Sequence, residues 1–110
     1  MLLNVIMQHN ATYVEQQTPK KTRVLHLKPQ KKCAIFSCMD ARLVNMLEPA
    51  LGIERGDAVI IKNSGNYSCH SFDQSIVSMI IAIFELDIEE IFVVGHFHCG
   101  VVESNSTTPQ

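Results

Sequence analysis

Three short apolar runs, each followed by a cluster of polar residues, restrict the possible folds of this chain more than any other feature. The runs cover about residues 32–37, 58–62 and 91–94, and helical patterns separate them. Each run is apolar on both faces, as strands of parallel sheets are. The order strand–helix–strand–helix–strand predicts a parallel sheet with right-handed crossovers. We therefore expect an α/β fold, with a mostly parallel sheet, helices on both faces and a further helix at the N-terminus.

The two connecting segments differ in their helical signals. In the first, Pro49 limits the helix or breaks it into short turns, and Gly52 is placed as a C-terminal stop. Its apolar positions are Leu43, Met46, Leu47 and Leu51. In the second, Ser71 and Gln74 have the spacing of a capping box. The apolar residues on one face of this second helix are Phe72, Ile76, Met79, Ile80, Ile83 and Phe84.

The N-terminal region has a different character from the rest of the chain. Residues 2–17 form a modest amphipathic helix, too weak to be stable by itself. Residues 18–30 contain two prolines and read as an extended linker. We divide the chain into a helix and linker over 1–30, an α/β core over 31–103 and a polar tail over 104–110. The apolar positions of the helix are Leu3, Ile6, Met7 and Val14.

Bulk composition excludes several classes of protein. The chain has 110 residues, of which 46% are hydrophobic and 18% charged, which is typical of one globular domain. A net charge of −2 argues against a nucleic-acid surface. The longest apolar stretch, residues 76–84, is too short to span a bilayer. The N-terminus lacks the cationic region of a signal peptide, and thiols without such a signal are more often reduced. We therefore expect a cytoplasmic protein that binds neither membranes nor nucleic acid.

The polar clusters at residues 38–42, 63–66 and 95–100 directly follow the three expected strands. In open α/β sheets, ligands bind outside the carboxyl ends of the strands. There the sequence offers two thiols and an imidazole, which are ligands suited to zinc. Three protein ligands with a vacant fourth position describe a catalytic zinc site. The candidate ligands are Cys38, His96 and Cys99.

Each candidate also has a simpler interpretation. Cys38 and Cys99 could be inert buried thiols, or they could pair as a disulfide in a redox-regulated binding module. Asp40 could cap a helix beside an incidental surface Arg42. In the functional interpretation, Arg42 keeps Asp40 ionised and aimed at the open metal position. His70 lies near a helix start at the same edge of the sheet and could line the pocket.

Three motifs together resemble the β-class carbonic anhydrases. They are C-M-D-A-R at residues 38–42, G-D-A-x-x-I-K-N-S-G-N at 56–66 and G-H-x-x-C-G at 95–100. The resemblance extends from about residue 33 to residue 100. It implies one zinc ion per chain on the two cysteines and the histidine, with Asp40 and Arg42 as the catalytic dyad. It also implies a pocket wall formed by Gly65 and its neighbours, and we include Asn66 and His70 in the candidate pocket.

The same resemblance implies an activity and an assembly. The expected reaction is the reversible hydration of carbon dioxide to bicarbonate, in a homodimer or a larger homo-oligomer with the N-terminal helix packed on the partner. Family domains continue beyond the third strand, whereas this chain stops ten residues past Gly100. Two alternatives therefore remain open: a shortened zinc-binding fragment with weak or no activity, and a hydrolase of a related small electrophile such as carbon disulfide.

Overall fold

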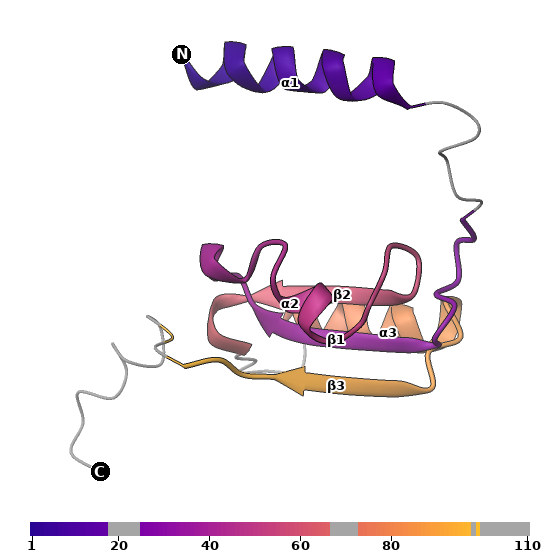
Figure 1. Ribbon diagram of the computed structural model, residues 1–110. Coiled ribbons are helices and arrows are strands. Elements are labelled where there is room, and N and C mark those ends of the chain that lie inside the picture. The colour runs from indigo at the N-terminus through magenta and orange to yellow at the C-terminus, as the bar shows by residue number, and fades with distance from the viewer. Residues whose placement is uncertain (18–24, 67–72, 98, 100–110) are drawn as a thin grey trace, which may run out of the picture.

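A parallel sheet of three strands forms the centre of the molecule (Figure 1). The computed structural model describes residues 1–17, 25–66, 73–97 and 99. The strands are β1 (Cys33–Cys38), β2 (Ala58–Asn63) and β3 (Glu90–Val94), in the order β2-β1-β3. All six residues of β1 are buried because this strand has a neighbour on each side. The predicted α/β fold with a parallel sheet is confirmed.

The register of the strands brings their carboxyl ends to one edge. Cys33 at the start of β1 lies opposite Ala58 of β2 and Glu90 of β3. At the other end, Cys38 lies opposite Asn63. The polar segments that follow the strands consequently leave the sheet side by side, as the sequence predicted.

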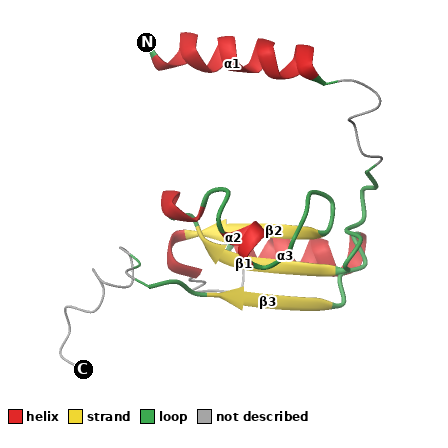
Figure 2. Ribbon diagram, in the orientation of Figure 1, coloured by secondary structure: helices red, strands yellow, loops and turns green. Residues whose placement is uncertain are grey.

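The two faces of the sheet carry separate apolar clusters. Ala34 and Ile35 are neighbours on β1, so their side chains point to opposite faces. On the Ala34 face, α3 (Gln74–Glu85) supplies Ala82, and Figure 2 shows this helix passing behind the strands. The Ile35 face is covered by the segment between β1 and β2, which contains the short helix α2 (Leu47–Ala50). Helical segments thus cover both faces, as predicted.

The first crossover consists of two short helical turns. A 3-10 turn, η1, covers Ala41–Leu43, and α2 follows it. Gly52 then adopts φ +69°, a left-handed conformation that glycine takes at helix ends without the penalty of a side chain. The proline and glycine signals in the sequence therefore predicted this segment correctly.

The orientation of α3 differs from the sequence prediction. The residues that face the sheet are the small Ser75 and Ala82, which are 6% and 1% exposed. The expected apolar face is largely open, with Ile80 48% and Phe84 77% exposed. The helix begins at Gln74 with Asp73 as its N-cap. Ser71 of the predicted capping box lies outside the described residues. Small side chains let a helix approach a sheet closely. Hydrophobic periodicity alone does not predict that a face of small residues will pack on the sheet.

The N-terminal helix lies apart from the sheet. Helix α1 (Leu2–Gln16) is confirmed where the sequence predicted it, but none of its residues is buried (Figure 1). The radius of gyration is 17.1 Å, whereas a compact chain of this length has about 13 Å. No helix among the described residues is long and apolar enough to cross a membrane.

Candidate metal centre

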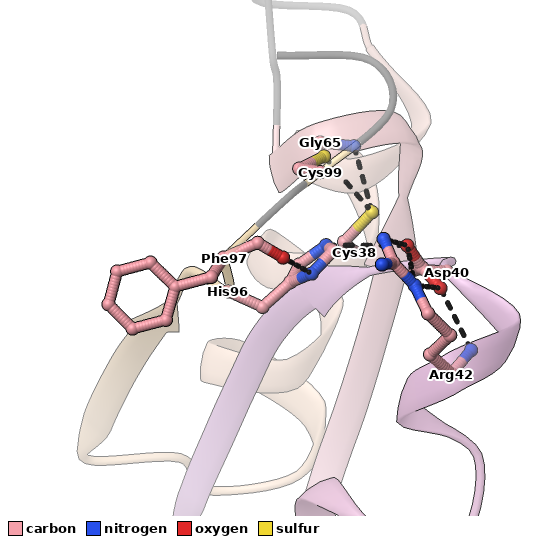
Figure 3. Close-up of polar contacts among 7 residues, drawn as sticks. All are labelled: Cys38, Asp40, Arg42, Gly65, His96, Phe97 and Cys99. Carbon is pink, nitrogen blue, oxygen red and sulfur yellow. Dashed lines mark hydrogen bonds and ion pairs between the residues drawn. The ribbon is translucent and has the colours of Figure 1, made fainter. Parts of the chain in front are cut away.

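The potential metal ligands Cys38, His96 and Cys99 meet at the carboxyl edge of the sheet (Figure 3). Cys38 ends β1, while His96 and Cys99 come after the end of β3. One ligand atom from each of the three residues lies within 4.8 Å of the others. Adjacent parallel strands thereby bring together two cysteines that are 61 positions apart in the sequence.

The separation of the two sulfur atoms fits a tetrahedral metal. Cys38 Sγ and Cys99 Sγ are 3.7 Å apart, and both residues are buried. Two Zn–S bonds of about 2.3 Å at a tetrahedral angle place the sulfurs about 3.8 Å apart. A disulfide would require about 2.05 Å. The structure therefore does not favour the alternative of a Cys38–Cys99 disulfide.

The imidazole of His96 offers one nitrogen to the site. Its Nδ1 lies 3.0 Å from the carbonyl oxygen of Phe97. With the proton on Nδ1 donated to that carbonyl, Nε2 retains its lone pair. This Nε2 is buried and has no hydrogen-bond partner among the described residues. A buried, unpartnered nitrogen beside two thiols fits a zinc ion well, because zinc would complete its bonding.

Asp40 and Arg42 form a tightly bound pair next to these ligands. Arg42 donates from Nε and Nη2 to the carboxylate at 3.0, 3.1 and 2.6 Å, and its backbone N–H donates to Oδ1 at 2.8 Å. These bonds hold the pKa of the Asp40 carboxyl well below its usual range. Asp40 Oδ2 is 3.9 Å from His96 Nε2. An ionised carboxylate thus lies beside the ligand cluster, and the capping of η1 by Asp40 accompanies this arrangement.

Gly65 contacts the cluster through its backbone. It belongs to the turn η2 (Ser64–Asn66) with φ +71°, and its N–H lies 3.4 Å from Cys38 Sγ. The sequence indicated a pocket wall here, whereas the structure adds a hydrogen-bond donor to the sulfur. Asn66 ends the same turn. His70 lies outside the described residues, so its predicted place in the pocket remains a prediction.

Two further residues near the site form a contact that the sequence did not predict, although Asn63 belongs to the polar cluster at residues 63–66. The Asn63 side chain donates from Nδ2 to Ser75 Oγ at 2.9 Å. Asn63 ends β2 and Ser75 lies in the first turn of α3, so their contact depends on how helix and sheet pack. No spacing rule links an asparagine to a serine in the next element, and the sequence therefore did not predict this contact.

Comparison with known proteins identifies the family. The model of the carbonic anhydrase family matches residues 33–110. "Putative carbonic anhydrase YtiB" of Bacillus subtilis (strain 168) is 40% identical over 105 residues, covering 96% of this chain and 56% of that protein. "Beta-carbonic anhydrase 1" of Mycobacterium tuberculosis (strain H37Rv) is 38% identical over 78 residues, covering 71% of this chain and 45% of that protein.

The fold gives the same result. The crystal structure of β-carbonic anhydrase isoform I from Trichomonas vaginalis matches with a TM-score of 0.83 and 38% identity, over 91% of this chain and 54% of that one. The present chain spans about half the length of these relatives. Its motifs, its parallel sheet and the cluster at the sheet's carboxyl edge fall within the shared region. The chain therefore belongs to the β-carbonic anhydrase family.

Proposed function

We propose that this protein catalyses the zinc-dependent, reversible hydration of carbon dioxide to bicarbonate. Cys38, His96 and Cys99 would hold one zinc ion per chain. The observation that carries the proposal is the sulfur separation of 3.7 Å beside a buried, unpartnered imidazole nitrogen. Membership of the family supports the choice of reaction.

The donor set accounts for the choice of metal and for the chemistry. Two thiolates and an imidazole select zinc over magnesium or calcium, which prefer oxygen ligands. Three protein ligands leave the fourth position of a tetrahedral ion open to solvent or substrate. Bound zinc supplies Lewis acidity, which makes water acidic enough to act as a nucleophile near neutral pH.

Asp40 and Arg42 would orient that nucleophile. The carboxylate of Asp40 is ionised at neutral pH and can only accept hydrogen bonds. By accepting a hydrogen bond from the attacking oxygen, it would direct a lone pair of that oxygen at the carbon of carbon dioxide. Arg42 fixes the carboxylate by two parallel bonds, from Nε to Oδ1 and from Nη2 to Oδ2, which restrict its rotation. Water and carbon dioxide yield bicarbonate, and the remaining proton passes to buffer.

The exposed apolar surfaces support a homodimer or a larger homo-oligomer. Leu3, Ile6, Met7 and Tyr13 of α1 are 64%, 53%, 59% and 60% exposed. A lone helix of this length is marginal in water, so these side chains need a packing partner. We propose that another copy of the chain provides it. We further propose a cytoplasmic location, because the two cysteine thiolates that the proposed zinc site requires suit a reducing compartment.

A combined measurement of zinc content and carbon dioxide hydration tests the proposed function. The 110-residue chain should contain about one zinc ion per chain and accelerate hydration in a stopped-flow assay with a pH indicator. The Cys38→Ser variant, which lacks one candidate zinc ligand, is the control for both measurements. Zinc binding without hydration would instead support the inactive zinc-binding fragment. Parallel measurement of carbon disulfide hydrolysis distinguishes the other alternative, because that substrate would then turn over faster than carbon dioxide.

A further inference from the structure

The turn after β2 reaches the candidate metal centre through one hydrogen bond. Gly65 N–H donates to Cys38 Sγ at 3.4 Å, as Figure 3 shows. The left-handed conformation of Gly65, φ +71° and ψ 24°, turns the amide toward the sulfur. Non-glycine residues seldom adopt this conformation. A donor held at a thiolate withdraws electron density from the sulfur and fixes the direction of its lone pairs.

A second set of bonds connects this turn to helix α3. Asn63, two residues before Gly65, is held by its backbone and by its side chain. Its carbonyl oxygen accepts from Met39 N–H at 2.8 Å, which ties it to the end of β1. Its Nδ2 donates to Ser75 Oγ at 2.9 Å. Ser75 is itself held in place. Its backbone N–H donates to Asp73 Oδ1 at 2.8 Å, and the residue is only 6% exposed.

We propose that Asn63 and Ser75 are positioning residues of the metal centre, holding the Gly65 amide against the sulfur of Cys38. This inference rests on the proposed function, because it assumes that Cys38 binds zinc. Neither residue supplies one of the potential ligand atoms, although Asn63 lies opposite Cys38 in the paired strands. Ser75 would act through its bond to Asn63, and Asn63 through the short turn that carries Gly65.

The physical effect of the Asn63–Ser75 hydrogen bond is to preorganise the turn that carries Gly65. Without the Asn63–Ser75 bond, the turn can move away from Cys38, and the sulfur loses both its donor and its fixed direction. Partners of metal ligands that lie outside the coordination sphere typically change metal affinity by about 10- to 100-fold. Ser75 lies one contact further out, so we expect its removal to weaken zinc binding by about tenfold, the lower end of that range.

The competing explanation is that this bond only joins α3 to the sheet. Both explanations predict some loss of stability, so unfolding measurements do not separate them. The electronic state of the Cys38 sulfur does separate them. With cobalt(II) in place of zinc, the thiolate-to-metal charge-transfer band reports the energy of the sulfur lone pairs. Loss of the N–H donor raises that energy and shifts the band to longer wavelength.

The test compares Ser75→Ala with Ser78→Ala in the full chain. Ser78 is an exposed serine in the same helix. Its variant therefore makes the same chemical change without removing the Asn63–Ser75 hydrogen bond. Zinc affinity is measured by competition with a chromophoric chelator, and the cobalt(II) band by absorption. Ser75→Ala should weaken zinc binding about tenfold and move the band to longer wavelength. Ser78→Ala should match the unaltered chain in both measurements.

Asn63→Leu provides a second variant, since leucine resembles asparagine in size and lacks the donor. It should reproduce the band shift of Ser75→Ala. Unchanged bands and affinities in both variants would overturn the positioning role while leaving the proposed function intact. If the unaltered chain bound neither zinc nor cobalt(II), the proposed function and this inference would both be overturned.

Discussion

The carboxyl edge of the sheet and the outer surfaces of the helices differ in how completely their groups are partnered. At the sheet edge, the Asp40 carboxylate and the Cys38 sulfur both have hydrogen-bond donors within the chain. On the outer surfaces, Ile6 of α1 and Phe84 of α3 remain 53% and 77% exposed. Strand β3 also carries exposed apolar side chains, and Val93 is 65% exposed. The chain thus assembles its candidate metal centre from its own residues, whereas much of the apolar surface of its described helices and of β3 is exposed.

This difference has a physical origin. The candidate metal centre needs only the ends of two adjacent strands and one turn, and short hydrogen bonds hold these in place. Covering an apolar helix face requires a second surface of similar size. Exposed patches of this kind mark interaction sites. The predictions below test each side of the comparison, beginning with the largest expected effect.

Loss of one candidate ligand should abolish metal binding. Cys38→Ser, His96→Ala and Cys99→Ser should each reduce zinc from about one per chain to nearly none, because two remaining ligands do not hold the ion. Elemental analysis measures this. Cys33→Ala is the control, since Cys33 is an equally buried thiol at the opposite end of β1 and should retain the metal. Full zinc retention in all three ligand variants would show that the cluster does not bind it.

Substitution in the dyad should affect the reaction and spare the metal. Asp40→Asn removes the charged acceptor of the hydrogen bond from the nucleophile, and we expect kcat to fall by about 100-fold with zinc unchanged. Arg42→Ala removes the bonds that depress the pKa of Asp40, so that pKa should rise toward its ordinary value. The acid limb of the activity profile should then move to higher pH. Equal activity of Asp40→Asn and the unaltered chain would exclude this carboxylate from the mechanism.

A charge placed on α1 should disrupt self-association. Light scattering should show a dimer or larger species for the unaltered chain, and Ile6→Glu should weaken it by about tenfold or more, because a charge buried at an apolar contact is costly. Gln8→Glu adds the same charge at a polar position of the same helix and should leave the assembly intact. A monomeric, cooperatively melting, active chain would show that α1 needs no partner subunit.

The smallest expected effect concerns the inner face of α3. Ala82 is 1% exposed against the sheet, so Ala82→Leu should lower the free energy of unfolding by about 1–2 kcal/mol through overpacking. Ser78→Leu introduces the same side chain at an exposed position of the helix. Urea denaturation compares the two variants. A larger loss for Ser78→Leu would mean that the outer face of α3 is the more tightly packed one.

Much of the fold could be predicted from the sequence because it depends on local patterns. Apolar runs defined the three strands, and Pro49 and Gly52 defined the short turns between β1 and β2. The placement of Cys38 and His96 at one edge followed from the general geometry of parallel sheets. The face of α3 was predicted wrongly, because periodicity identifies an apolar stripe but not the surface that covers it.

The sequence by itself determined which groups are available for metal chemistry and at which strand ends they lie. Only the tertiary structure decided that the two sulfurs stand 3.7 Å apart and that no described residue forms a hydrogen bond with His96 Nε2. The tertiary structure also decided that Asn63 meets Ser75. These contacts join residues from different elements, so they follow from the register of the strands and the close packing of α3. Such distances arise from the balance of many contacts, whereas strands and turns arise from a few neighbouring residues.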